Sequence, residues 1–157
     1  MLKFVDVKEV FAEIPDEITL AISISGCPIQ CKGCHSRYLW EDVGEELTAE
    51  VLSAQLRKHF GVSCICFMGG DQSPEEVNRL AQWVKEHSTV NTAWYSGREK
   101  LPETIALENF DYVKLGRYDE ERGPLNNPGT NQRLWKVTHA NGSHAQTDIT
   151  PRFWKRV

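Results

Sequence analysis

The apolar positions of the chain repeat first at strand spacing and then at helix spacing. Residues 18–25 (ITLAISIS) alternate apolar and small polar side chains, a pattern that predicts a β-strand. In residues 48–60 the apolar positions recur on one helical face, behind Thr48 as a favourable N-cap and before Gly61 as a stop. Residues 62–68 (VSCICFM) form a short, nearly continuous apolar run, which is typical of a strand buried on both faces of a parallel sheet.

The alternation of strand and helix continues toward the carboxyl end. Ser73, Pro74 and Glu76 combine an N-cap serine, a proline at the first helical position and a glutamate at the third, so a second helix is expected to begin there. The later elements expected are a strand at 92–96, a short helix at 102–108 and a strand at 111–115. This order predicts an α/β fold of parallel β/α units, in the form of an open, partial (β/α) barrel of about four to six parallel strands.

The length of the chain predicts the number of domains, and its two ends predict additions to the sheet. The 157 residues are expected to form one domain, 1–157, well short of the roughly 250 residues of a closed eight-fold barrel. Residues 1–17 are expected to add an edge segment. Residues 133–150 predict a carboxyl-terminal β-hairpin, because Asn141-Gly142 suits a type I′ turn.

Charge and hydropathy narrow the choice of partners. The formal net charge of −4 argues against nucleic-acid binding, which needs a basic surface. The longest apolar runs are of strand length, so no membrane span is expected, and the start of the chain has no pattern of a secretion signal. We therefore expect a cytoplasmic protein in which the five cysteines are reduced.

Three of the cysteines, Cys27, Cys31 and Cys34, form a C-x3-C-x2-C run directly after the first strand. Four thiolates saturate a [4Fe–4S] cluster, whereas three leave one iron open to a ligand that the protein does not supply. An enzyme needs such an open iron and a pure electron carrier does not. The run therefore favours a catalytic [4Fe–4S] cluster.

Zinc is the main alternative for these cysteines, with His35 or a more distant residue as the fourth donor. Zinc sites more often join two C-x2-C pairs, no second pair follows here, and consecutive Cys34 and His35 reach one ion only under strain. A disulfide is less favoured, because the number of cysteines is odd. Cys64 and Cys66 alternate along a strand that is expected to be buried, so we interpret them as core residues.

Gly69, Gly70 and Asp71 follow the second strand, at the edge where β/α sheets collect their binding sites. Glycine lets backbone groups approach a ligand, and the carboxylate of Asp71 is able to accept a charge-assisted hydrogen bond from an ammonium group. A tight strand-to-helix turn explains the same three residues without any ligand. The cysteine run leaves the first strand at the same edge, which favours a shared site.

These motifs resemble those of the radical S-adenosylmethionine (SAM) enzymes, in which the open iron binds the amino and carboxylate groups of SAM and a GGE or GGD turn holds its amino group. Gln72 stands where many of these enzymes have proline. Over its whole length the chain resembles the activating proteins of anaerobic ribonucleoside-triphosphate reductases. The segments that carry this resemblance are Ser25-Gly26-Cys27 with the cysteine run and His35, Gly69-Gly70-Asp71, Tyr95-Ser96-Gly97, residues 111–118 (DYVKLGRY) and residues 129–134 (GTNQRL).

The resemblance implies a single radical SAM domain with site residues of three kinds. The [4Fe–4S] cluster is held by Cys27, Cys31 and Cys34; SAM is bound by His35 against the adenine and by Gly69, Gly70, Asp71 and Lys114; and the partner is bound by Arg117, Asn131, Gln132 and Arg133. Lys114 and Arg117 suit the SAM carboxylate or the partner, and a surface salt bridge explains them equally well. A role in capping the end of a helix or strand explains residues 131–133 as well as partner binding does.

The function implied is that of a radical SAM activase, an oxidoreductase that acts on another protein. One electron breaks the S–C5′ bond of SAM, and the 5′-deoxyadenosyl radical takes a hydrogen atom from the Cα of a glycine in the reductase large subunit. A flavodoxin- or ferredoxin-type protein is the implied electron donor. An incomplete barrel leaves an opening through which the glycine loop of the partner enters.

Two other interpretations stay open on the sequence. Within the same class, the chain activates another glycyl-radical enzyme or acts as a small radical SAM enzyme on a purine-like molecule. In a different class, it is a non-enzymatic iron–sulfur or zinc module. The Gly69–Asp71 turn at the expected edge argues against this last interpretation.

Overall fold

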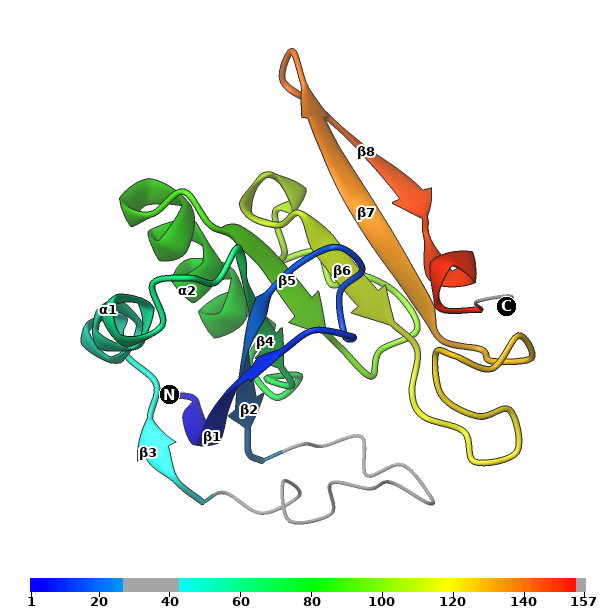
Figure 1. Cartoon of the computed structure of the whole chain (residues 1–157), viewed down its shortest axis with the longest axis horizontal. Coiled ribbons are helices and arrows are strands. Elements are labelled where there is room, and N and C mark those ends of the chain that lie inside the picture. The colour runs from blue at the N-terminus through cyan, green and yellow to red at the C-terminus, as the bar shows by residue number, and fades with distance from the viewer. Residues whose placement is uncertain (27–42, 155–157) are drawn as a thin grey trace.

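The computed structural model describes residues 1–26 and 43–154, and its strands form one open sheet (Figure 1). The strands are β1 (Lys3–Val10), β2 (Thr19–Ile24), β3 (Glu45–Glu46), β4 (Cys64–Met68), β5 (Asn91–Tyr95), β6 (Tyr112–Leu115), β7 (Arg133–Ala140) and β8 (Ser143–Asp148). The helices are α1 (Ala49–Lys58) and α2 (Pro74–His87), with the 3-10 turns η2 (Leu107–Asn109) and η3 (Thr150–Phe153).

The sheet has the strand order β3-β1-β2-β4-β5-β6-β7-β8. Its centre, β2, β4, β5 and β6, is parallel, with Ile22 opposite Phe67 and Phe67 opposite Trp94. The strands toward both edges pair antiparallel: β3 with β1, β1 with β2, β6 with β7, and β7 with β8. The described strands therefore form a mixed sheet whose edges are β3 and β8.

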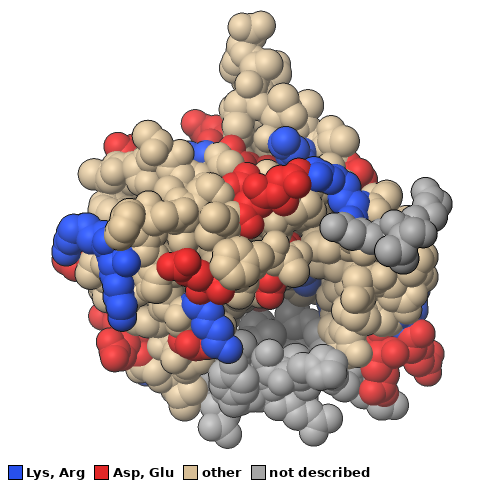
Figure 2. All heavy atoms as spheres, in the orientation of Figure 1, with Lys and Arg blue, Asp and Glu red and all other residues tan. Residues whose placement is uncertain are grey.

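The predicted α/β class is confirmed, but the predicted barrel of parallel strands is not. Antiparallel pairings outnumber parallel ones, because β1 and β3 extend the sheet on one side and β7 and β8 extend it on the other. These additions lengthen the sheet sideways, so the described strands do not close on themselves. On the face shown in Figure 2, acidic side chains gather near the centre.

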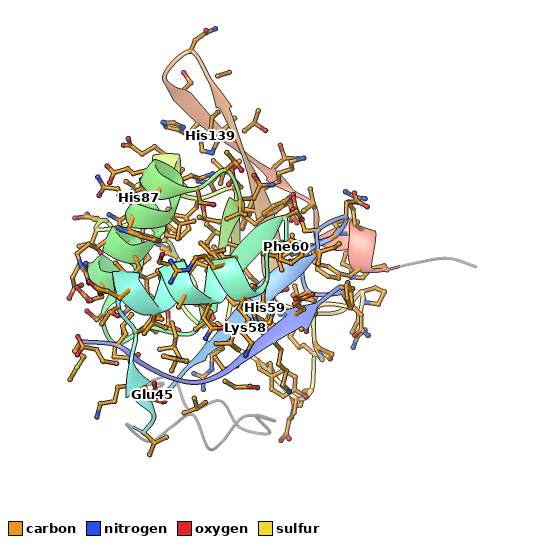
Figure 3. The ribbon with its side chains drawn as sticks, turned by 60° about the vertical axis from the view of Figure 1, so that its left-hand side comes forward. Glu45, Lys58, His59, Phe60, His87 and His139 are labelled. Atoms are coloured by element: carbon orange, nitrogen blue, oxygen red, sulfur yellow. The ribbon has the colours of Figure 1, made fainter. Side chains whose placement is uncertain are left out.

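The two helices begin where the sequence predicts. The hydroxyl of Thr48 accepts a hydrogen bond from the amide of Val51 at 3.2 Å and so caps α1, whereas the Ser73 side chain makes no cap bond to α2. Pro74 is the first residue of α2. Lys58 ends α1 on the surface, and Phe60 follows it with 91% of its surface exposed (Figure 3).

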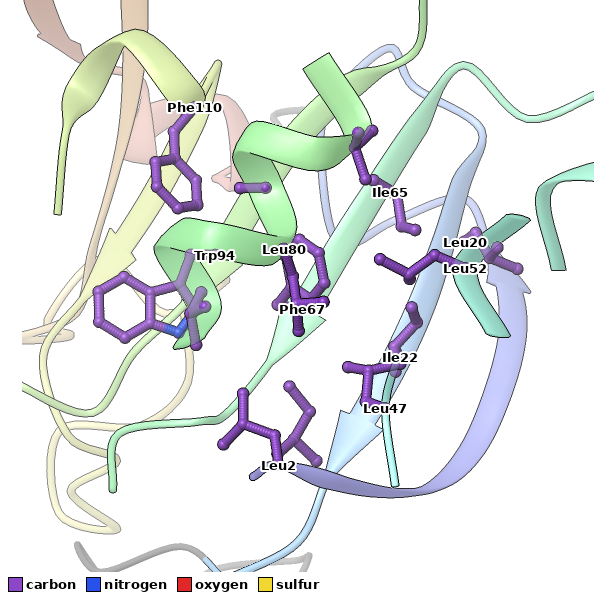
Figure 4. Close-up of a cluster of buried hydrophobic side chains, with 14 of the residues drawn as sticks. Leu2, Leu20, Ile22, Leu47, Leu52, Ile65, Phe67, Leu80, Trp94 and Phe110 are labelled. Atoms are coloured by element: carbon purple, nitrogen blue, oxygen red, sulfur yellow. The ribbon is translucent and has the colours of Figure 1, made fainter. Parts of the chain in front are cut away.

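One face of the parallel strands and the two helices enclose the main hydrophobic core (Figure 4). Because strand side chains alternate between faces, every second residue enters this core. The strand residues are Leu20, Ile22, Ile65, Phe67, Trp94 and Val113, and the helix residues are Leu52, Val77, Leu80, Ala81 and Val84. In α2, Val77, Leu80, Ala81 and Val84 recur at helical spacing, so they share one face and are all buried.

The opposite face of the strands carries a smaller cluster, made of Ile14, Cys64, Cys66, Ala93, Tyr112 and Leu134. Cys64 and Cys66 are fully buried and free, which confirms their interpretation as core residues. Burial raises the pKa of both thiols far above the usual value, so they stay protonated. A buried thiol is a poor nucleophile and a poor metal ligand.

The helix predicted at 102–108 is wrong, since only the 3-10 turn η2 is helical in this region. The side-chain oxygen of Asn78, in α2, accepts hydrogen bonds from residues of this segment and of η2. This oxygen accepts hydrogen bonds from the amide of Ala106 at 2.8 Å and from the side chain of Asn109 at 3.2 Å. A short isolated stretch gains too little from helix formation to compete with these contacts.

The two ends of the chain form the antiparallel parts of the sheet. Asn141 and Gly142 join β7 to β8 with φ angles of 49° and 80°, both left-handed as a type I′ turn requires, so the expected hairpin is present. The segment 1–17 contains β1, of which β3 covers only Lys3 and Phe4. Within the described ranges no helix is both long and apolar enough to cross a membrane.

Candidate functional site

The carboxyl ends of the four parallel strands meet at one edge of the sheet, which we call the carboxyl edge: Ile24, Met68, Tyr95 and Leu115 with the loops that follow them. The fold brings to this edge the residues that precede Cys27, the Gly69–Asp71 turn, and Lys114 with Arg117. Cys27, Cys31, Cys34 and His35 themselves lie outside the described residues.

The turn after β4 requires glycine at two positions. Gly69 and Gly70 have φ angles of 112° and 91°, which side chains of L-residues disfavour. A Cβ on Gly69 would lie 3.0 Å from the carbonyl oxygen of Ile24, and one on Gly70 would lie 2.6 Å from Cγ2 of Val77. The carbonyl of Gly69 accepts a hydrogen bond from the indole of Trp94 at 2.7 Å. The turn is therefore packed tightly against the end of β2.

Asp71 is buried, with 2% of its surface exposed, and its carboxylate organises the loop after β5. Oδ1 accepts a hydrogen bond from the hydroxyl of Ser96 at 2.5 Å, and Oδ2 accepts one from the amide of Gly97 at 3.0 Å. Nε of Arg98 lies 3.7 Å from Oδ1, and the same guanidinium donates to the backbone carbonyl of Asp71 at 2.6 Å. Since a carboxylate offers about four acceptor positions, these partners do not use all of them.

Ser96 and Arg98 are site residues that the sequence motifs did not reveal. Ser96 entered only as part of the family resemblance, and Arg98 belonged to no motif. The hydroxyl of Ser96 also accepts a hydrogen bond from the amide of Arg98 at 3.0 Å, so Asp71 and residues 96–98 form one hydrogen-bonded unit. Their place directly after a parallel strand, at the same edge as Gly69–Asp71, is the signal that would have found them.

Lys114 is buried near the end of β6, with 7% of its surface exposed. Its Nζ donates a hydrogen bond to the carbonyl of Gly116 at 3.0 Å and lies 5.5 Å from the centroid of the Tyr95 ring. The side chain lines a cavity of about 380 Å³ on the face of the sheet opposite the helices, together with Glu13, Tyr95, Leu125, Gln132 and Phe153. A buried cation at a cavity wall is a suitable partner for a carboxylate.

Asn131 and Gln132 hold the turn that follows β6. The side-chain amide of Asn131 donates to the carbonyl of Arg117 at 3.1 Å, and that of the buried Gln132 donates to the carbonyl of Gly116 at 3.4 Å. A Cβ on Gly116, whose φ is 105°, would lie 3.1 Å from the carbonyl oxygen of Asn131. Both side chains therefore have internal structural partners, while the side chain of Arg117 is exposed.

Arg133 belongs to the hairpin side of the molecule. Its guanidinium lies 3.5 Å from the carboxylate of Asp148 and 5.7 Å from the centroid of the Trp154 ring. The structure thus gathers Lys114, Arg117, Asn131 and Gln132 around Gly116 and directs Arg133 elsewhere.

The described histidines have partners on other parts of the surface (Figure 3). His59 lies 2.6 Å from Glu9, and His87 lies 2.9 Å from the carbonyl of Trp83. Within residues 1–26 and 43–154, no group of three or more His, Cys, Asp and Glu side chains is arranged to hold a metal ion. The zinc alternative therefore gains no ligand set from the described residues.

Comparison with protein families identifies an iron–sulfur domain in this chain. A family model described as a 4Fe-4S single cluster domain matches residues 18–134, about three quarters of the chain. The match includes the cysteine run and all four parallel strands, and it supports the predicted [4Fe–4S] cluster. Searches of curated proteins and of solved structures found no significant match. The chain therefore belongs to the family of 4Fe-4S single cluster domains.

Proposed function

We propose that the protein is a radical SAM activase, which cleaves SAM reductively at its [4Fe–4S] cluster and generates a glycyl radical on an anaerobic ribonucleoside-triphosphate reductase. The observation that carries this proposal is the contact between two loops at the carboxyl edge. The Gly69–Asp71 turn packs against Ile24 of β2, three residues before the first cysteine of the run. A second binding element beside the cluster suits an enzyme, and an electron carrier does not need it.

The donor groups of the chain fit both proposed cofactors. Thiolates are the usual ligands of iron–sulfur clusters, and three of them leave one iron open for SAM. The free acceptor positions of Asp71 suit the SAM ammonium, and Lys114 suits the SAM carboxylate. Held by Cys27, Cys31 and Cys34, a reduced cluster would supply the single electron that reductive cleavage of SAM requires.

In this proposal the residues of the chain bind and orient SAM and shield it from water, and they take no part in the breaking or forming of bonds. Ser96, Gly97 and Arg98 fix the orientation of the Asp71 carboxylate before any ligand binds. Tyr95 and Phe153 line the cavity beside Lys114 with aromatic rings, which would limit the access of water to a bound ligand. Exclusion of water and of reactive side chains protects a radical on its way to the partner.

The open sheet supports a macromolecular substrate. Because the described strands do not close into a barrel, no complete wall surrounds the carboxyl edge in the described part of the chain. Arg117 is exposed at this edge and is the best candidate for contact with the reductase large subunit. The electron donor is a flavodoxin- or ferredoxin-type protein, and neither nucleic acid nor a membrane takes part.

Reductive cleavage of SAM tests the proposed chemistry. The protein is reconstituted anaerobically with iron and sulfide, reduced with dithionite and supplied with SAM, and 5′-deoxyadenosine is measured by chromatography. The activase forms 5′-deoxyadenosine. A protein that binds and reduces a cluster but forms no 5′-deoxyadenosine is an iron–sulfur module without this activity, and the proposal is then wrong.

The choice of partner is tested through Arg117. Arg117→Ala removes an exposed side chain, so we expect wild-type SAM cleavage together with weaker glycyl-radical formation on the reductase. Arg57→Ala, on the exposed surface of α1, is the matched control and leaves both steps unchanged. SAM cleavage without any radical on the reductase would instead favour another glycyl-radical enzyme or a purine-like substrate.

A further inference from the structure

One hydroxyl group joins the two ends of the segment that contains the cysteine run. Ser25 is buried and lies two residues before Cys27, while Val43 is the first described residue after the range 27–42 that holds the cysteine run. The Oγ of Ser25 donates a hydrogen bond to the carbonyl of Val43 at 2.5 Å and accepts one from the amide of Val43 at 3.2 Å. The backbone of position 43 therefore has both of its polar groups satisfied by a single side chain.

The chain is also anchored on both sides of this junction. The amide of Ser25 donates to the carbonyl of Lys3 at 3.0 Å, which ties the end of β2 to β1. On the other side, β3 pairs with Lys3 and Phe4 of β1. Gly44, whose φ is 103°, lies so close to β1 that a Cβ there would come within 2.2 Å of the carbonyl oxygen of Phe4. Both ends of the segment thus rest on the same strand.

Gln72 connects this junction to the turn after β4. Its side-chain amide Nε2 donates a hydrogen bond to the carbonyl of Ser25 at 2.8 Å. A Cβ on Gly26, whose φ is 76°, would lie 2.9 Å from the same nitrogen, so Gln72 crosses the backbone where only glycine leaves room. Gln72 directly follows Asp71, and the bond therefore links the start of the cysteine run to the Gly69–Asp71 turn.

We propose that Ser25 and Gln72 are positioning residues for the iron–sulfur cluster: Ser25 holds the two ends of the cysteine-bearing segment together, and Gln72 fixes them to the Gly69–Asp71 turn. This inference rests on the part of the proposed function that assigns Cys27, Cys31 and Cys34 as cluster ligands. Holding the ends of a loop together lowers the entropy that ligation must overcome, so the cluster is retained longer. The Gln72 bond also holds Ser25, two residues before the first cysteine, against the Gly69–Asp71 turn.

The test is the rate at which the reconstituted protein loses iron to an excess of a ferrous chelator under anaerobic conditions. Gln72→Ala and Ser25→Ala should each lose iron roughly two- to tenfold faster than the wild type, the range that one net hydrogen bond supports. The matched controls are Gln82→Ala on α2 and Ser53→Ala on α1, whose side chains bond only to neighbours on their own helix. Both controls should keep the wild-type rate.

A second measurement separates positioning from general stability. Gln72 is exposed, so Gln72→Ala should keep the wild-type melting temperature even if the buried Ser25→Ala loses stability. At an unchanged melting temperature, the electron paramagnetic resonance spectrum of the reduced cluster should broaden in Gln72→Ala and stay unchanged in Gln82→Ala. Gln72→Glu keeps the shape but loses the donor, so it should behave like Gln72→Ala.

Equal rates of iron loss and equal spectra for Gln72→Ala, Gln72→Glu and the wild type would overturn the inference. These measurements need only a bound cluster and not SAM cleavage. A wild-type protein that binds a cluster and does not cleave SAM refutes the proposed function alone, whereas equal rates refute the inference alone. A wild-type protein that binds no cluster refutes both.

Discussion

Among single residues, Asp71 makes the contacts that connect two loops of the carboxyl edge. Its carboxylate contacts Ser96, Gly97 and Arg98, which lie after a different strand. The sequence pattern suggested a ligand role for this residue, and the structure adds a structural one. The two roles act on different quantities, since the structural contacts change the free energy of unfolding and a ligand contact changes the affinity for SAM.

We expect Asp71→Ala to affect both quantities. Loss of the carboxylate leaves buried donors of Ser96 and Gly97 without an acceptor, which should lower the free energy of unfolding of the cluster-free protein by about 1–3 kcal/mol in a denaturant titration. Loss of a charge-assisted bond to the ammonium group should weaken SAM binding by about tenfold or more.

Two variants separate the effects of Asp71. Ser96→Ala removes only one donor and should cost less stability than Asp71→Ala. Asp71→Asn keeps an acceptor but loses the negative charge, so it should retain more stability while still weakening SAM binding. Unchanged affinity for SAM in Asp71→Asn, measured by a titration, would show that the carboxylate does not contact SAM.

The turn between β4 and α2 is the element that relates the cysteine-bearing segment to the rest of the site. It contacts the end of β2 through Gly69 and the first turn of α2 through Gly70. A substitution here acts through the backbone, because both residues have left-handed φ angles. The shape of this turn therefore depends on glycine more than on any side chain.

Gly70→Ala should destabilise the protein by at least about 1–2 kcal/mol, the cost of a left-handed alanine, because the added Cβ also meets Val77. Gly61→Ala is the matched control. Nothing lies within 4 Å of a Cβ at Gly61, so its effect should stay within about 0.5 kcal/mol. Thermal or urea unfolding measures both, and equal stability of the two variants would contradict this description of the turn.

Elements that bury one regular stripe of apolar residues could be predicted from the sequence. The parallel strands and the two helices lie close to their predicted ranges, because their core residues recur at strand or helix spacing. The stretch 102–108 was mispredicted because the side chain of Asn78, distant in sequence, determines its backbone contacts. The mixed sheet was missed because a half-exposed strand such as β1, which lies between β3 and β2, has a pairing that depends on the whole fold.

The candidate site was predictable only in part, for a similar reason. The cysteine run and Gly69–Asp71 are local patterns whose chemistry can be inferred from spacing. The partners of Asp71 come from residues 96–98, and the bond from Gln72 to Ser25 joins two loops, so neither has a local pattern. Asn131 and Gln132 have internal partners that no motif indicates.

For the whole molecule, the division of the five cysteines determines where a cluster can form. All five lie within the region that matches the 4Fe-4S single cluster domain. Cys64 and Cys66 are fully buried in the smaller cluster on the face of the strands opposite the helices, and burial raises the pKa of their thiols. We therefore propose that the cysteine run supplies the thiolates of the cluster.

Replacing Cys27, Cys31 or Cys34 singly by alanine should remove most of the bound iron, because each variant loses one of three cluster thiolates. Cys64→Ala, at a buried position, is the matched control and should keep the wild-type iron content. Iron and sulfide assays after anaerobic reconstitution measure the difference. Full iron content in Cys31→Ala, or its loss in a folded Cys64→Ala, would show that the ligands are assigned wrongly.

The most direct test of the proposed function is the transfer of a radical to the partner. The reconstituted protein is incubated anaerobically with a candidate reductase large subunit, SAM and dithionite, and the electron paramagnetic resonance spectrum is recorded. The account predicts the doublet of a glycyl radical, which requires SAM and is lost in Cys31→Ala. Absence of this doublet, with a full cluster and an intact complex of the two proteins, would contradict the assignment as the activase of this reductase.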